Sequence, residues 1–157
     1  MILVTLGTQK FQMNRLVQAA DEYAATIEEE VFIQTGHSTY EPQHARHAQF
    51  VDAAEFQEMI RTCSVLVTHS GVGSIITGVN AGRPVVVVPS MNRYKEHVDD
   101  HQVQIAKAFA GKGIVLDCED VAELPAMIEK ARTYPFKPYV VAGGKIEDII
   151  LDYIKMF

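Results

Sequence analysis

Short apolar runs alternate along the chain with longer segments of helical periodicity. The runs consist mainly of valine, isoleucine and leucine without alternating polar positions, which is typical of strands covered on both faces. They lie at 2–6, 31–34, 49–51, 65–68, 85–88 and 114–116. Between the first two runs, apolar residues from Met13 to Ile27 follow the i, i+3, i+4, i+7 spacing of an amphipathic helix.

Further helices are expected at about 55–62, 73–81, 99–110, 121–132 and 145–156. Strands that alternate regularly with helices favour a parallel sheet with right-handed crossovers and helices on both faces. The sequence therefore predicts a Rossmann-like, doubly wound α/β fold. No repeat, low-complexity tract or linker divides residues 1–157, so we expect a single domain.

Two connections differ from the rest of the chain in composition. Residues 35–47 are polar and contain glycine and proline, so we expect an irregular loop there. Residues 134–144 carry two prolines and two glycines, which would separate a C-terminal amphipathic helix at 145–157 from the remainder. The apolar side of that helix either packs onto the domain's own sheet or docks in part onto a partner chain.

Composition excludes several classes of protein. A net charge of −6 argues against a general nucleic-acid-binding surface, which would require a basic patch. Cys63 and Cys118 give no disulfide framework and fit a reducing compartment. No apolar run approaches the roughly 20 residues of a membrane helix, and the first residues lack the basic leader of a signal peptide. We therefore expect a soluble, cytoplasmic protein.

In an open parallel sheet, ligands bind beyond the carboxyl ends of the strands. Three polar segments follow predicted strands and are the candidates for a site. They are Gly7, Thr8 and Gln9 after the first strand, residues 69–74 (HSGVGS) after the fourth, and residues 92–102 (NRYKEHVDDHQ) after the fifth.

The HSGVGS turn is the most direct candidate. Gly71 and Gly73 allow the backbone to approach an anion, and Ser74 can act as an N-cap or a donor at the start of the next helix. Free N–H groups and the positive end of that helix suit a diphosphate. Alternatively, the glycines merely form a tight turn. Because Ile76 fills the third glycine position of a dinucleotide fingerprint and no Walker lysine follows, NAD and ATP are disfavoured.

His69 and the charged loop are less specific. His69 ends a buried strand beside the glycines and is either a structural group or a phosphate contact. Amide, carboxylate and imidazole side chains at 96–102 suit the several hydroxyls of a sugar, although a solvated helix start would have the same composition. His97 and His101 are four residues apart, but no third metal ligand accompanies them, so no metal is expected.

Three motifs in order then carry a family resemblance: VTLGTQ, VTHSGVGSIITGVNAGRPVVVVPS and EHVDDHQ. Together they resemble the C-terminal, donor-binding domain of family 28 glycosyltransferases, which is half of the GT-B fold. More closely, they resemble the stand-alone subunits of two-component enzymes: the cytosolic subunit of the eukaryotic lipid-linked UDP-GlcNAc transferase, and catalytic subunits of bacterial exopolysaccharide and capsule transferases. The resemblance extends from Met1 to about Leu116, with Lys95 in place of the glycine of the bacterial group.

The resemblance implies a UDP-sugar-dependent hexosyl- or glucuronosyltransferase. It would move the sugar with inversion to a polyprenyl-diphosphate-linked saccharide, together with a membrane-anchored partner that binds the acceptor and recruits the chain to the membrane. No cofactor beyond the UDP-sugar substrate is implied. The alternative is a non-catalytic regulatory or scaffold subunit that binds UDP-sugar. Self-association is a further expectation, because a lone donor domain leaves its acceptor-facing surface uncovered.

The resemblance also assigns roles to individual residues. The backbone of Phe50 and Val51 would read the uracil edge. Thr77 stands where the family carries a glutamate that holds the ribose, so that contact is lost or supplied elsewhere. The general base would come from the partner, with His69 and Asp99 as the candidates in this chain. The implied donor contacts are Gly7, Thr8, Gln9, Phe50, Val51, His69, Gly71, Val72, Gly73, Ser74, Thr77, Glu96, Asp99, Asp100, His101 and Gln102.

Overall fold

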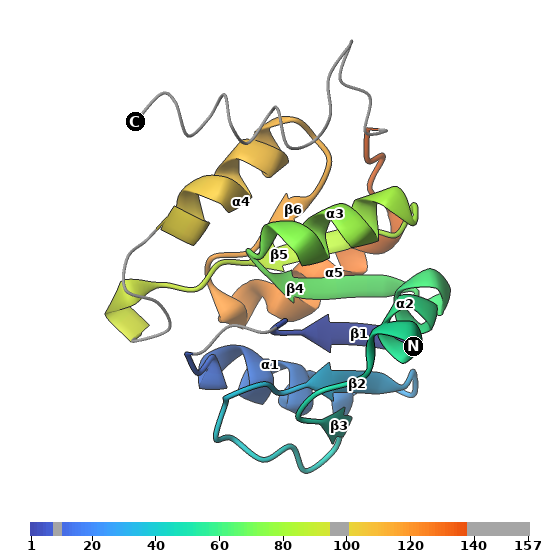
Figure 1. Cartoon of the computed structure of the whole chain (residues 1–157), viewed down its shortest axis with the longest axis vertical. Helices are drawn as coiled ribbons and strands as arrows, with labels where there is room; N and C mark the ends of the chain where they lie inside the picture. The colour runs from blue at the N-terminus through green and yellow to red at the C-terminus, as the bar shows by residue number, and fades with distance from the viewer. Residues whose placement is uncertain (8–10, 95–100, 138–157) are drawn as a thin grey trace.

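The computed structural model of the chain (Figure 1) describes residues 1–7, 11–94 and 101–137. Six strands form one sheet in the order β3-β2-β1-β4-β5-β6, and all pairs are parallel. The strands are β1 (Ile2–Thr5), β2 (Val31–Gln34), β3 (Arg46–Ala48), β4 (Val65–His69), β5 (Val85–Val88) and β6 (Leu116–Asp117). The helices are α1 (Asn14–Ala24), α2 (Ala53–Thr62), α3 (Val72–Asn80), α4 (His101–Gly111) and α5 (Leu124–Thr133), with 3₁₀ turns at η1 (Asn92–Tyr94) and η2 (Val121–Glu123).

The strand order confirms the predicted Rossmann-like fold and places its switch point beside β1. The chain first winds outward through β2 and β3, then returns to pair β4 against the other side of β1. Ile2 consequently faces Val31 in β2 and Val65 in β4. In such sheets the crevice at the switch point, beyond the carboxyl ends, is where ligands bind.

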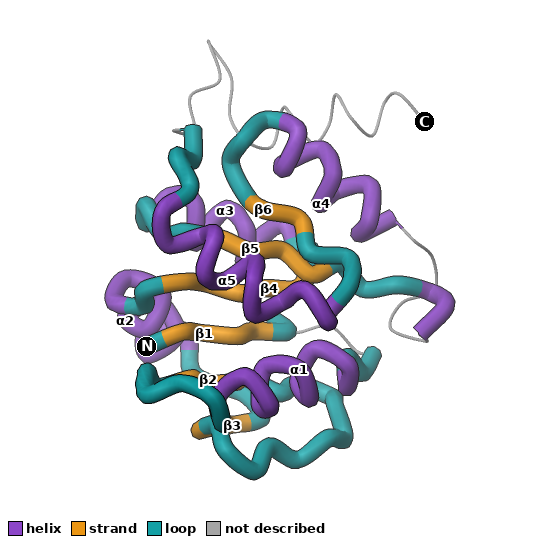
Figure 2. Tube along the Cα trace, turned by 180° about the vertical axis from the view of Figure 1, so that it is seen from behind, coloured by secondary structure: helices purple, strands orange, loops and turns teal. Residues whose placement is uncertain are grey.

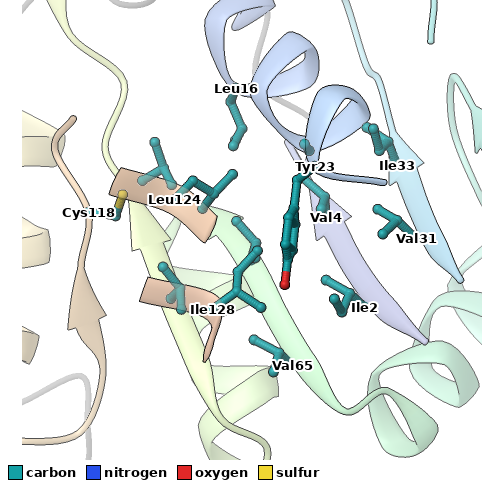
Figure 3. Close-up of a cluster of buried hydrophobic side chains, with 14 of the residues drawn as sticks. Ile2, Val4, Leu16, Tyr23, Val31, Ile33, Val65, Cys118, Leu124 and Ile128 are labelled. Atoms are coloured by element: carbon teal, nitrogen blue, oxygen red, sulfur yellow. The ribbon is translucent and has the colours of Figure 1, made fainter. Parts of the chain in front are cut away.

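Helices cover both faces of the sheet, as the uninterrupted apolar strands predict. Figure 2 shows α1 and α5 on one face, and Figure 3 shows the core that they enclose, where Val4 of β1 lies among Leu16, Tyr23 and Leu124. On the opposite face α2, α3 and α4 pack on a second core. Both cores are contiguous with the strands, so the strand ends are held rigidly from two sides.

The predicted third strand was wrong: β3 is Arg46–Ala48, which begins within the segment 35–47 that was expected to be irregular, whereas 49–51 lie beyond the sheet. Arg46 and His47 are exposed, because an edge strand that pairs only with β2 tolerates polar residues. The position of β3 is set from α1. The buried carboxylate of Asp21 accepts hydrogen bonds from the backbone N–H of Gln43 (2.9 Å), His44 (2.8 Å) and Ala45 (2.9 Å), directly before the strand.

Boundaries elsewhere differ less. The last strand was predicted at 114–116 but is Leu116–Asp117, and the helix expected at 121–132 begins with the turn η2. The helix predicted at 145–157 lies outside the described residues. Among those described, none of the helices is long and apolar enough to cross a membrane. Cys63 and Cys118 are free and buried, and burial raises the pKa of Cys63 to about 11 and that of Cys118 to about 12.

Candidate functional site

Buried polar side chains of the described residues gather at the carboxyl edge of the sheet, with Asp21 as the exception. Burying a polar group is costly unless it is hydrogen-bonded, so this concentration marks the edge as the place where the fold holds polar groups for a purpose beyond packing. The edge is the one at which the sequence placed its candidates. The side chains are Thr5, Gln34, Thr35, Thr68, His69, Ser70 and Ser90.

His69 lies between two glycines on neighbouring strand ends. A Cβ atom on Gly7 would lie 2.3 Å from Nε2 of the imidazole, and one on Gly71 would lie 2.2 Å from Cε1. Gly7 also has a φ of 60°, which favours glycine. Both residues are therefore glycine for steric reasons that the sequence did not reveal, and His69, 6% exposed, is part of the wall between β1 and β4.

The start of α3 offers unfilled backbone donors to the crevice. Gly71 takes the N-cap position, the carbonyl of Gly71 accepts from Ile75 N–H (3.0 Å), and no side chain caps the helix. The N–H groups of the first turn therefore project toward the crevice together with the positive end of the helix dipole. Of the two roles predicted for Ser74, the N-cap role is wrong, because Ser74 is the third residue of the helix, whereas its role as a donor stays a prediction.

Gly73 differs from Gly71 in its surroundings. No atom lies within 4 Å of the position that a Cβ on Gly73 would occupy, and the residue is exposed. Packing within the domain thus does not require glycine at this position. An open space above donors at a helix N-terminus fits the close approach of an anion.

A pocket of about 230 Å³ lies beside this turn, at the ends of β1, β2 and β3. We call it the Phe50 pocket. Phe50 is 49% exposed and contacts His37 edge-to-face, with 5.7 Å between ring centroids. The structure brings the predicted residues Phe50 and Val51 together with Gly7. The lining residues are Thr5, Gly7, Gln34, Phe50, Val51, Ala53 and Phe56.

Larger hollows exist on the flanks of the molecule. One of about 620 Å³ lies between α1 and the start of α5, and one of about 560 Å³ lies between α2 and α3. Neither is lined by the buried polar groups at the carboxyl edge. We place the site at the Phe50 pocket and the α3 turn, because the buried polar residues Thr5 and Gln34 line that pocket and Gly7 connects it to the turn through His69.

Thr77 is not brought to the Phe50 pocket. Its hydroxyl donates to the carbonyl of Gly73 (2.8 Å), within its own helix, and the residue lines the hollow between α2 and α3. A ribose contact from Thr77 therefore has no counterpart in the geometry of the pocket.

The first residues of α4 close the other side of the crevice. The carbonyl of Gln102 accepts from Ser70 Oγ (2.7 Å), and its side-chain Oε1 accepts from Ser90 N–H (3.1 Å). Gln102 thus ties α4 to the ends of β4 and β5, and His101 precedes it at the start of the helix. Thr8, Gln9, Lys95, Glu96, His97, Asp99 and Asp100 lie outside the described residues. Within residues 1–7, 11–94 and 101–137, no three histidine, cysteine or acidic side chains cluster as metal ligands would.

Two buried polar residues at the site were missed from the sequence. Gln34, 4% exposed, bonds to both neighbouring strand ends, and Thr5, fully buried, bonds to Gln34. The available signal was a single amide that closes the otherwise apolar run VFIQ.

Further along the edge, burial and the neighbouring Glu119 carboxyl raise the pKa of Asp117, at the end of β6, to about 7.

Solved structures share this fold. The glycotransferase of kitacinnamycin is 25% identical with a TM-score of 0.65, over 85% of this chain and 35% of that one. The glycosyltransferase SsfS6 from Streptomyces sp. SF2575, solved with thymidine diphosphate, is 22% identical with a TM-score of 0.57, over 84% and 32%. ALG13, solved by NMR, is 18% identical with a TM-score of 0.59, over 90% and 89%. No curated protein matches the chain.

The chain spans about a third of the length of the first two of these proteins. Its six-stranded parallel sheet corresponds to one half of the GT-B glycosyltransferase fold. The family comparison covers most of the chain, because the glycosyltransferase family 28 C-terminal domain matches residues 1–145. The chain, with its carboxyl-edge crevice between β1 and β4, therefore belongs to the family of glycosyltransferase 28 C-terminal domains.

Proposed function

We propose that the chain is the donor-binding, catalytic half of an inverting glycosyltransferase that transfers a sugar from a UDP-sugar to a polyprenyl-diphosphate-linked saccharide. The observation that carries the proposal is the continuity of the Phe50 pocket with the uncapped turn of α3. Gly7 lines the pocket and packs on His69, which in turn packs on Gly71 at the start of that helix. A base in the pocket and a diphosphate at the turn would thus be neighbours.

The α3 turn would act on the leaving group. When the sugar departs, negative charge develops on the β-phosphate of UDP. Fixed N–H groups aimed at that position stabilise such charge without reorganisation, and removal of one such donor typically costs about 10²–10³ in kcat. The open space over Gly73 lets the phosphate reach those N–H groups.

The Phe50 pocket would receive the base. Its wall combines the half-exposed ring of Phe50 with the apolar side chains of Val51 and Phe56, and the polar groups of Thr5 and Gln34 lie at the strand ends. An apolar slot with few polar groups is the usual form of a small-molecule site. Two glycosyltransferase neighbours were solved with thymidine diphosphate, another pyrimidine nucleotide.

A second subunit would supply the acceptor. The longer glycosyltransferase neighbours contain about two thirds of their length beyond the part that this chain matches, whereas ALG13 is matched over 89% of its length. We propose a membrane-anchored partner in exopolysaccharide or capsule synthesis, which brings the lipid-linked acceptor and the general base. His69 and Asp99 are the candidates for a base within this chain.

Two measurements test the proposal. Calorimetric titration measures UDP binding. A transfer assay follows labelled sugar from UDP-glucuronate, UDP-galactose or UDP-GlcNAc to lipid-linked saccharide in membranes that contain the partner. Ser74→Ala and Gln102→Ala are expected to weaken both binding and transfer, whereas Gln104→Ala, two residues further along α4, leaves both unchanged. Transfer should persist in EDTA, since the turn supplies the charge stabilisation. UDP binding without any transfer would instead identify a non-catalytic subunit.

A further inference from the structure

Gln34 connects three chain segments at the end of β2. Its Oε1 accepts from the Thr5 hydroxyl (2.7 Å) and from Leu6 N–H (3.1 Å), at the end of β1. Its Nε2 donates to the carbonyl of Gln49 (2.7 Å), in the segment that leads to Phe50. The side chain is 4% exposed and lines the Phe50 pocket.

The orientation of the amide follows from its partners. Leu6 N–H can only donate, so the atom that faces it must be the oxygen, and the Gln49 carbonyl can only accept, so the atom that faces it must be the nitrogen. The Thr5 hydroxyl must therefore give its proton to Gln34, and its lone pair accepts Gly7 N–H (3.1 Å). The direction of each hydrogen bond is determined without ambiguity.

These bonds form one relay across the switch point of the sheet. It runs from Gly7 N–H through the Thr5 hydroxyl and the Gln34 amide to the Gln49 carbonyl. Gly7 borders His69 on the α3 side of the crevice, and Phe50 and Val51, which directly follow Gln49, line the Phe50 pocket. The relay therefore determines the separation between the two sides that a bound nucleotide would touch.

We propose that Gln34 is a positioning residue that determines the base selectivity of the Phe50 pocket by holding the backbone at 49–51 at a fixed distance from Gly7. The inference rests on the proposed nucleotide binding. The edges of uracil and cytosine differ in where they donate and accept hydrogen bonds. A backbone that moves by a fraction of an ångström loses alignment with one edge without losing the stacking that both rings share.

The Gln34→Glu variant tests this directly. The carboxylate has the shape of the amide and can still accept from Thr5 and Leu6, but it places an oxygen against the Gln49 carbonyl and repels it. We expect UDP affinity to fall about tenfold and the ratio of UDP to CDP affinity to fall with it. The affinity for inorganic pyrophosphate, which would bind at the α3 turn and is measured by competition with UDP, should be unchanged.

Two further variants complete the test. Gln34→Met removes the amide without adding charge, and is used if Gln34→Glu does not fold. Gln57→Glu makes the same chemical change at an exposed position of α2, outside the pocket, and should bind UDP and CDP as the wild type does. A purely structural role for Gln34 would weaken UDP, CDP and pyrophosphate equally. That result, or an unchanged UDP-to-CDP ratio, overturns the proposal.

Amide exchange without nucleotide separates this inference from the proposed function. The N–H of Gly36 also donates to the Gln49 carbonyl (2.9 Å), and Leu6 N–H donates to Gln34. In Gln34→Met both amides should exchange at least tenfold faster, while the β5 amides keep their rates. If the wild type binds no UDP, the proposed function fails, and exchange alone then decides whether Gln34 holds this backbone. Unchanged exchange at Leu6 and Gly36 refutes it.

Discussion

The imidazole of His69 occupies the space that a side chain on Gly71 would need, since a Cβ atom there would lie 2.2 Å from Cε1 of the ring. Gly73, two residues further along, has no atom within 4 Å of the same position. One turn therefore contains a glycine that packing requires and a glycine whose space is open. The two glycines allow folding and ligand binding to be tested separately.

Alanine at these two positions should produce opposite results. Gly71→Ala forces the ring or the turn to move, and we expect a loss of about 1–3 kcal/mol in the free energy of unfolding. Gly73→Ala should be at least as stable as the wild type, because alanine is the better helix residue, yet its methyl group covers the N–H groups of the turn. Urea unfolding and UDP titration measure both effects. Wild-type UDP affinity in Gly73→Ala would show that no phosphate approaches the helix there.

Phe50→Ala should affect binding more than stability. The ring is 49% exposed, so its removal costs little packing. Stacking of a base on an aromatic side chain is worth about 1–3 kcal/mol by alanine substitution, and UDP affinity should fall accordingly. Phe50→Tyr, which keeps the ring, serves as the control in the same titration. Equal UDP affinity in Phe50→Ala and Phe50→Tyr would place the base outside this pocket.

Glu29 should make stability sensitive to acid. Burial alone would raise its pKa, but hydrogen bonds from Ser64, Arg132 and the N-terminal amine outweigh it and lower the pKa to about 2. Because the folded-state pKa lies below the unfolded value near 4.5, the contribution is present above pH 4.5 and is lost as the pH falls toward 2.

Replacement of this carboxylate tests the contribution. Glu29→Gln should be less stable than the wild type by about 1–3 kcal/mol at pH 7, and the gap should narrow at pH 3 and close as the pH falls toward 2. Glu30→Gln removes the more exposed carboxylate that pairs with Arg46 and should cost under about 1 kcal/mol. Urea unfolding at pH 7, 4.5 and 3 gives the comparison. A constant gap across this range would show that Glu29 titrates normally.

Asp117 predicts the opposite pH trend. Burial and the Glu119 carboxyl raise its pKa to about 7, above the ordinary value of 3.8. The protonated form is therefore favoured by folding, and its contribution is complete below pH 3.8 and lost as the pH rises through 7. Asp117→Asn should match the wild type at pH 4 and exceed its melting temperature at pH 8. Identical melting curves at pH 8 would contradict the raised pKa.

Strand position was predictable where both faces of the strand are buried. The runs at β1, β2, β4 and β5 are buried along their whole length and mainly apolar, and each lies close to where the sequence placed it. The edge strand β3 was not predictable, because exposed Arg46 and His47 give no apolar signal. Its position depends instead on Asp21, whose carboxylate binds the backbone more than twenty residues away along the chain.

Part of the candidate site was likewise predictable from the sequence, and part was not. The turn after β4 and the residues Phe50 and Val51 were singled out from motifs and resemblance. The structure places Phe50 and Val51 in one pocket with Gly7, which packs on His69 beside that turn. The N-cap role of Ser74 was wrong, and for Thr77 the sequence left open whether the ribose contact is lost or supplied elsewhere. Helix phase and the exact first residue of α3 decide where such hydroxyls point, and a one-residue shift is enough to redirect them.

The succession of apolar runs and helical segments by itself determined a doubly wound sheet with its ligand edge at the carboxyl ends, because strands covered on both faces leave few other arrangements. Only the tertiary structure decided which residues meet there. Gln34 bonds to Thr5, 29 residues earlier, and to Gln49, 15 residues later, and His69 explains two glycines on different segments. Such contacts depend on the register of parallel strands and on side-chain packing, which involve residues that are remote in the sequence.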